Sequence, residues 1–219
     1  GVDPDTASIE EAAGRLRAAL AAGDPDATWM RRSAGLPEDL TWGPGGVPMH
    51  AEDLIRECVA ATVAFEEDPG LSAEDQASIM SLDLADWLGA LIGLVRTGPG
   101  SDADAPALVA HIETCPEIDG QPLDADDASL IEHAFELLLP AWQVAGIVDD
   151  DRRLTEVGAW MLPRAAAAAW RGSFDDETDG HDTIDLPDPR DLLGDGLGHL
   201  GDGSTDVDPY DEDAEEDVL

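Results

Sequence analysis

Lysine and asparagine are absent from this sequence of 219 residues, and its 11 basic residues are all arginine. Without lysine, the chain cannot use Schiff-base chemistry, a Ser-x-x-Lys nucleophile or a P-loop. Neither a GxSxG turn nor a GxGxxG segment that follows a predicted strand is present. These absences favour a non-catalytic function over an enzyme, and we expect no cofactor.

Cysteine is almost as scarce, since the chain has only Cys58 and Cys115, which lie in different predicted helices and in no CxxC pair. Two such thiols do not make a disulfide framework, and we expect both to be small buried hydrophobic side chains. The five histidines form no HxxxH or HExxH pattern. This spacing argues against a zinc site.

Long apolar runs are missing as well. Spanning a bilayer takes roughly 20 consecutive apolar residues, and the longest candidate, LGALIGLVRTG at residues 88–98, is shorter and contains an arginine. No basic segment precedes an apolar one at the start of the sequence, so no signal peptide is expected. We therefore predict a soluble, cytoplasmic protein with no membrane partner.

Negative charge, in contrast, is in large excess. Fifty acidic residues oppose the 11 arginines, which gives a formal net charge of −39. Adaptation to high internal salt, an acidic tail or mimicry of a polyanion would each produce such a composition. The self-repulsion destabilises a compact state and is screened by salt. The expected partner is another protein, with a basic surface, and nucleic-acid contact by the full-length chain is not expected.

The hydrophobic pattern predicts a mainly α-helical protein. Ser8 and Glu11 are expected to form the capping box of the first helix, and Gly23 is expected to end it. Ser72 and Thr155 are expected to cap two later helices. Pro140 and Pro163 should kink or interrupt two later helices. Helices are predicted over residues 8–23, 24–35, 51–67, 77–98, 106–115, 129–146 and 157–170.

Composition divides the chain into three parts. Residues 1–98 form the predicted helical N-terminal part, and residues 104–172 form a second helical part that is expected to pack on the first as one domain. Residues 173–219 contain 18 acidic residues and one arginine, with much glycine and proline. Few hydrophobic side chains and high net charge are typical of disorder, so we predict a disordered acidic tail.

Within this tail, the segment DDETDGHDTIDL imitates a calcium-binding EF-hand loop. Asp175, Glu177 and Asp179 fall at loop positions one, three and five and are the candidate metal ligands. Position twelve should be a bidentate glutamate but is Leu186. We therefore favour a solvated acidic segment over a specific calcium site.

The segment GIVDDDRRLTEVGAWML, residues 146–162, reads as a short strand, an acidic turn, a return strand and a T-x-x-G helix start. With the helix before it, residues 128–170 resemble the C-terminal half of a winged-helix module. The resemblance implies a small β-hairpin wing near the C-terminus. If the wing contacted nucleic acid, the cationic side chains available would be Arg152, Arg153, Arg164 and Arg171.

Charge argues against that use of the wing, because three aspartates adjoin its arginines and the preceding helix carries glutamates. The preferred hypothesis is a non-catalytic protein-interaction or regulatory protein. The alternatives are a DNA-binding transcriptional regulator masked by its acidic tail, a DNA mimic, and an enzyme from a salt-adapted or high-GC organism. An enzyme stays open because catalytic residues can converge from distant positions.

Overall fold

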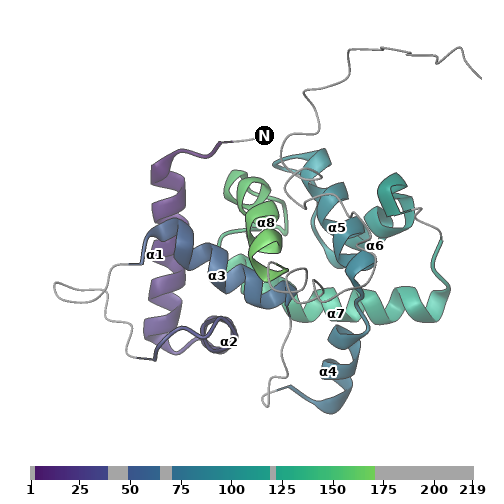
Figure 1. Ribbon diagram of the computed structural model, residues 1–219, viewed down its shortest axis with the longest axis horizontal. Helices are drawn as coiled ribbons and strands as arrows, with labels where there is room; N and C mark the ends of the chain where they lie inside the picture. The colour runs from purple at the N-terminus through teal and green to yellow at the C-terminus, as the bar shows by residue number, and fades with distance from the viewer. Residues whose placement is uncertain (1–2, 39–48, 65–70, 119–121, 171–219) are drawn as a thin grey trace, which may run out of the picture.

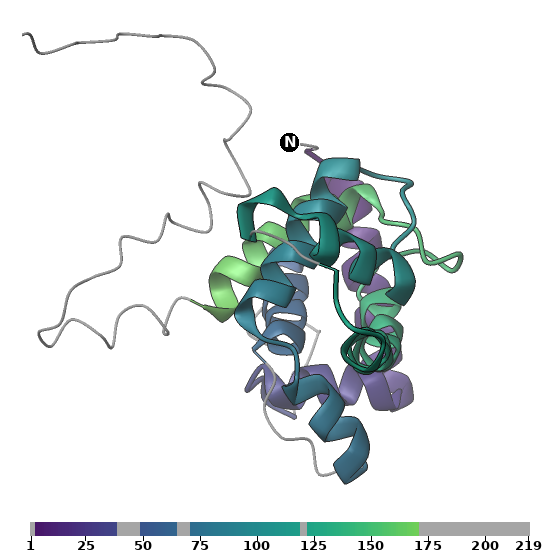
Figure 2. The same ribbon diagram turned by 90° about the vertical axis from the view of Figure 1, so that its right-hand side faces the viewer.

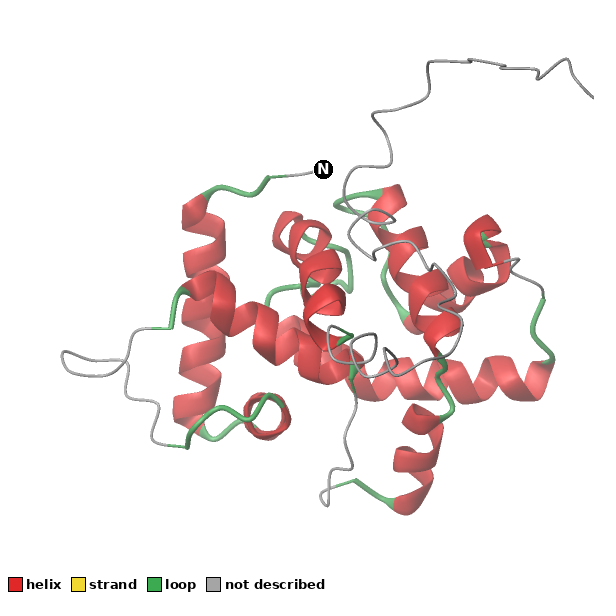
Figure 3. Ribbon diagram, viewed as in Figure 1, coloured by secondary structure: helices red, strands yellow, loops and turns green. Residues whose placement is uncertain are grey.

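The computed structural model describes residues 3–38, 49–64, 71–118 and 122–170. These residues are mainly helical, which confirms the predicted fold class at this level (Figure 3). The predicted tail, residues 173–219, lies outside the described residues. The elements are α1 (Thr6–Ala22), α2 (Pro25–Ser33), α3 (Ala51–Val63), α4 (Ala73–Met80), α5 (Leu84–Thr97), α6 (Ala105–Thr114), the 3-10 helix η1 (Pro116–Ile118), α7 (Ala125–Val144) and α8 (Glu156–Ala169).

Short polar side chains begin most of these helices. Ser72 and Thr155 cap α4 and α8, as the sequence predicts, by accepting hydrogen bonds from backbone N–H groups one turn on. The prediction for α1 is wrong by one turn. The cap is Asp5, whose carboxylate accepts from the Ser8 backbone N–H at 2.7 Å. Asp5 takes this role because a carboxylate that precedes the helix satisfies the N–H groups that Ser8 would leave free.

The predicted helix over residues 77–98 is in fact two helices, α4 and α5, bent by 74° at their junction. Asp83 begins α5 with a reciprocal capping box. Its carboxylate accepts from the Asp86 N–H at 2.9 Å, and the Asp86 carboxylate accepts from the Asp83 N–H at 3.1 Å. This local pairing satisfies the first turn of α5 and lets the chain turn sharply after Met80.

Neither Pro140 nor Pro163 ends its helix, because α7 and α8 continue through them. A proline inside a helix removes one backbone hydrogen bond. Around Pro140, the buried side chains of Leu138, Leu139 and Trp142 hold α7 in the core and offset that loss.

All eight α-helices of the described residues contribute to one hydrophobic core. In Figure 1, α8 lies between α3 and α5, and α7 runs from the centre of the molecule to its right-hand side, above α4. Viewed from the side, α7 is seen end-on, with α4 packed against it (Figure 2). Trp142 of α7 is fully buried, and its ring lies 6.5 Å from that of Trp87. The Trp87 ring meets Phe135 edge to face at 5.6 Å.

A tight turn at residues 147–155 joins α7 to α8. Val148 pairs with Leu154 in an isolated antiparallel bridge. Asp149 holds the turn, because its carboxylate accepts from the backbone N–H groups of Asp151 and Arg153, both at 2.9 Å. Arg152 has a positive φ of 56°. Because the described residues contain bridges but no strand, the predicted β-hairpin wing is not established as a strand pair.

A second chain segment, residues 100–103, lies alongside this turn. The Gly100 N–H donates to the Leu154 carbonyl at 2.7 Å, and the Leu154 N–H donates to the Ser101 carbonyl at 3.0 Å. Asp102 and Arg153 form a further antiparallel bridge. Hydrogen bonds therefore stabilise the turn internally and also join it to the connection between α5 and α6.

Among the described residues, no single helix is long and apolar enough to cross a bilayer. The helices α4 and α5 reach that length only as a pair, across their 74° bend.

Candidate interaction surface

The outward side of α7 is acidic. Its inward side carries the buried residues Ile131, Phe135 and Leu138, spaced three to four residues apart. Asp124 caps the helix, so the chain enters the first turn of α7 with a cluster of carboxylates. The acidic side chains of α7 that are exposed or half-exposed are Asp126, Asp127, Glu132 and Glu136.

Arg152, predicted as a nucleic-acid contact, turns back onto α7. Its guanidinium donates to the Glu136 carboxylate at 2.5 Å. This hydrogen bond raises the pKa of Arg152, whose side chain, like that of any arginine, is a cation at every physiological pH. Its charge is opposed by a carboxylate of the same chain, which reduces what it offers to a phosphate.

Arg153 and Arg164 also make contacts within the chain. Arg153 donates to the Gly100 carbonyl at 3.2 Å and lies 3.7 Å from the Asp102 carboxylate. Arg164 donates to the Trp160 carbonyl at 2.7 Å and lies over the Trp160 ring, 4.0 Å from its centroid. Arg171 lies outside the described residues.

The residues that carry the winged-helix resemblance have a clear structural role. The Thr155 hydroxyl accepts from the Gly158 N–H at 2.8 Å and donates to the Gly146 carbonyl at 2.7 Å. Gly158 is required because a Cβ there would lie 2.1 Å from the Ile147 carbonyl oxygen. The T-x-x-G segment therefore fixes the start of α8 against the end of α7.

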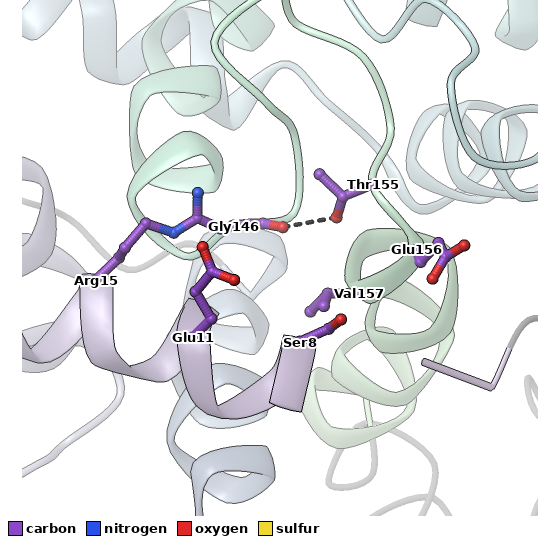
Figure 4. A pocket seen from close by; sticks show the side chains of 7 residues that line it. All are labelled: Ser8, Glu11, Arg15, Gly146, Thr155, Glu156 and Val157. Atoms are coloured by element: carbon purple, nitrogen blue, oxygen red, sulfur yellow. Dashed lines mark hydrogen bonds between the residues drawn. The ribbon is translucent and has the colours of Figure 1, made fainter. Parts of the chain in front are cut away.

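A small open pocket of about 240 Å³ lies next to this junction (Figure 4). Sequence reasoning did not find it, because its two sides are more than 130 residues apart in the chain. One side is a stripe of α1 at helical spacing, and the other is the start of α8. The lining residues are Ser8, Glu11, Arg15, Gly146, Thr155, Glu156 and Val157. Its mixed charges and open shape do not by themselves indicate a ligand.

The described thiols and histidines do not assemble a metal centre. Cys58 is buried, and this burial raises its pKa to about 12, so it is not a thiolate nucleophile near neutral pH. His133 pairs with Asp75 of α4 at 3.0 Å, and burial lowers the pKa of His111. In the part of the chain that the structure describes, no three His, Cys, Asp or Glu side chains come together as a metal site. The predicted ligands Asp175, Glu177 and Asp179 lie outside that part.

Three large hydrophobic side chains that sequence reasoning did not single out are exposed to solvent. They are Met80, Leu84 and Leu130. The amphipathic pattern alone could not reveal Met80 and Leu84, because residues 77–98 were predicted as one continuous helix.

Comparison with family models, with curated proteins and with solved structures finds no match to this chain.

Proposed function

We propose that this chain is a non-catalytic protein-interaction module that binds a basic partner protein through an acidic face. This face consists of the outward side of α7 and the tip of the 147–155 turn. Its residues are Asp126, Glu132, Glu136, Asp150 and Asp151. The partner's lysines or arginines would complement these carboxylates, which steer association and select against acidic competitors.

The order of elements supports a winged-helix-like arrangement for this part of the chain. The helix α5, the bridged segment 100–103, the helices α6 and α7, and the 147–155 turn follow one another in the order that such modules use. The turn takes the place of the wing. In DNA-reading relatives of this arrangement, the second helix of the helix pair enters the major groove with its N-terminal residues on the bases. The corresponding helix here is α7, whose N-terminal half would bring carboxylates toward phosphates.

The single observation that carries the proposal is the Arg152–Glu136 ion pair. It joins the turn to the acidic side of α7. The Arg152 guanidinium, which a wing would present to DNA, contacts the protein itself instead. A face with this charge favours a basic protein over a polyanion.

The test is affinity capture from source-cell lysate with the immobilised full-length chain at about 0.15 M salt, close to the ionic strength at which exposed charges still interact over about 8 Å. The natural chain should retain a basic protein, and neutralising four carboxylates of the acidic face should release it. Glu136 is not substituted, so that its ion pair with Arg152 is kept. The test substitutions are Asp126→Asn, Glu132→Gln, Asp150→Asn and Asp151→Asn.

A control variant changes the net charge equally but lies elsewhere on the chain. Its substitutions are Asp3→Asn, Glu10→Gln, Glu38→Gln and Glu52→Gln. The control should retain the partner. If both variants lost the partner protein equally, net charge alone would account for the interaction. Capture of nucleic acid instead of protein would contradict the proposal.

Mimicry of DNA is the second candidate, because the same acidic face would suit a protein that normally binds a polyanion. The two candidates differ in one measurement. If the captured protein is released by added duplex DNA and binds that DNA on its own, the face acts as a DNA mimic. If DNA does not compete, the interaction is an ordinary protein contact.

A further inference from the structure

Three exposed apolar side chains stand out on this highly charged molecule. Met80 is 64% exposed, and Leu84 and Leu130 are each 40% exposed. They are the large hydrophobic side chains exposed among the described residues. Single exposed apolar residues are common on protein surfaces, so their significance depends on whether they lie together.

Met80 and Leu84 lie on the two sides of the bend between α4 and α5. Met80 is the last residue of α4, and Leu84 is the first residue of α5. The Asp83–Asp86 capping box fixes the chain between them. The two side chains therefore lie at the adjoining ends of two helices, on either side of one bend.

Leu130 belongs to the side of α7 that faces this bend. One turn toward the start of α7, Asp127 lies close enough to Asp86 of α5 for its charge to raise the pKa of Asp86, although burial contributes more to that shift. One turn toward the end of α7, His133 contacts Asp75 of α4 at 3.0 Å. Leu130 lies between these two contacts, so α4, α5 and α7 bring the three apolar residues to one region, the α4–α5 corner.

The surroundings of the α4–α5 corner are acidic. No arginine occurs between Arg56 and Arg96, or between Arg96 and Arg152, so α4, the start of α5 and α7 contain none. The neighbouring carboxylates on these elements are Glu74, Asp75, Asp83, Asp86, Asp126 and Asp127.

This charge decides which kind of molecule can cover the apolar residues. A second copy of the chain would place carboxylates against carboxylates, which opposes association through this corner. A segment with apolar side chains on one side and lysine or arginine beside them satisfies both features. An amphipathic helix presents that combination when it packs onto an apolar surface.

We propose that the α4–α5 corner docks a cationic amphipathic helix of a partner protein, with Met80, Leu84 and Leu130 contacting its apolar side. This inference rests on the proposed function, because it supplies the apolar contact for the basic partner of the acidic face. Asp126 and Asp127 connect the two surfaces along the first turns of α7. A mostly electrostatic contact thereby gains apolar anchors, and such anchors hold most of the binding energy of an interface.

The test uses two synthetic helical peptides of equal length and equal positive charge, one with leucines on one side and lysines on the other, and one with glutamines in place of the leucines. Binding to the full-length chain is measured by fluorescence anisotropy at about 0.15 M salt, where surface charges are partly screened. Any purely electrostatic binding is the same for both peptides. The natural chain should bind the leucine peptide about tenfold more tightly, as expected for a contact with apolar anchors.

The double variant Leu84→Gln and Leu130→Gln should lose this preference. A control variant, Ala18→Gln on the exposed side of α1, should keep it. Circular dichroism and thermal unfolding verify that both variants are folded. Equal binding of the two peptides, or a preference that survives the double variant, would overturn the proposal. A dimer of the natural chain that the double variant converts to a monomer would also overturn it.

Partner capture separates failure of this inference from failure of the proposed function. If Leu84→Gln with Leu130→Gln leaves capture unchanged while Asp150→Asn with Asp151→Asn abolishes it, the proposal for the α4–α5 corner fails and the proposal for the acidic face stands. In the second case, Leu84→Gln with Leu130→Gln abolishes both the peptide preference and the capture, while Asp150→Asn with Asp151→Asn keeps the capture. The α4–α5 corner then binds the partner, and the turn is no part of the interface.

Discussion

Gly158 is the residue whose identity the fold restricts most directly. A Cβ at this position would lie 2.1 Å from the Ile147 carbonyl oxygen, which belongs to the backbone and cannot move aside as a side chain could. Replacing Gly158 by alanine should therefore lower the free energy of unfolding by about 3 kcal/mol, the upper part of the range for overpacked core positions. Denaturant unfolding followed by circular dichroism measures the change.

Gly14 provides the matched control for this substitution. It also lies in a helix, α1, but apart from its chain neighbours and the nearby backbone of that helix, no atom lies within 4 Å of a Cβ built there. Gly14→Ala should raise the free energy of unfolding by roughly 0.5–1 kcal/mol, because alanine is the better helix former. If both alanine variants shifted stability in the same direction, the close approach of Gly158 to Ile147 would not be the cause.

Thr62 and Trp142 form a buried polar pair between α3 and α7. The Trp142 indole N–H donates to the Thr62 hydroxyl at 2.9 Å, and that hydroxyl donates to the Val59 carbonyl at 2.7 Å. Both side chains are fully buried. Thr62→Val keeps the shape but leaves the indole N–H without an acceptor, which costs about 1–3 kcal/mol.

Thr62→Ser is the control, because it keeps the hydroxyl and removes only a methyl group. In urea unfolding, the serine variant should be the more stable of the two. The reverse order would mean that the methyl packing of Thr62, rather than its hydrogen bond, holds α3 and α7 together.

At the scale of elements, the sequence predicted features that depend on neighbouring residues, such as helix ends, but not contacts between distant residues. Ser72, Thr155 and the left-handed Gly23 mark the ends of helices as predicted, because each acts on backbone groups within one turn. The break before Asp83 was missed although its capping box is local, because the apolar pattern runs through it. Arg152 could not be paired with Glu136 from the sequence, since 16 residues and a turn with a positive φ separate them.

The crossing of α5 and α6 contains a histidine that should respond to pH. The His111 ring fills the space where a Cβ of Gly93 would lie, and burial lowers the pKa of His111 below its ordinary value of 6.5. The unfolded chain therefore binds this proton more readily than the folded chain does. The stability that neutral His111 provides is complete above pH 6.5 and decreases as the pH falls from there toward the lowered pKa.

His111→Gln keeps a polar side chain of similar size that does not titrate. The melting temperature of the natural chain, relative to that of this variant, should fall between pH 7.5 and pH 5. The comparison between the two proteins is essential, because the other titratable groups contribute the same pH dependence to both. A constant difference in melting temperature would show that burial of His111 does not penalise its charged form.

At the scale of the whole molecule, negative charge is the dominant property, and its effect on the fold differs from its effect on the two proposed binding surfaces. The core that joins α1 to α8 is apolar and leaves the carboxylates on the surface. The sequence predicted the mainly helical fold from these apolar positions. It could not predict the acidic face or the α4–α5 corner, because both depend on how α7 lies against elements that are distant in the chain.

The net charge of −39 should make stability depend strongly on salt. Raising the ionic strength from about 0.01 M to about 1 M shortens the Debye length from about 30 Å to about 3 Å, which removes most repulsion between exposed carboxylates. The melting temperature should therefore rise with potassium chloride, most steeply over the first few tenths molar. Sucrose at equal osmolarity is the control, because it stabilises compact states by exclusion without screening charge. A melting temperature that stays flat or falls with salt, or that rises equally with sucrose, would mean that repulsion among the carboxylates does not limit the stability of this fold.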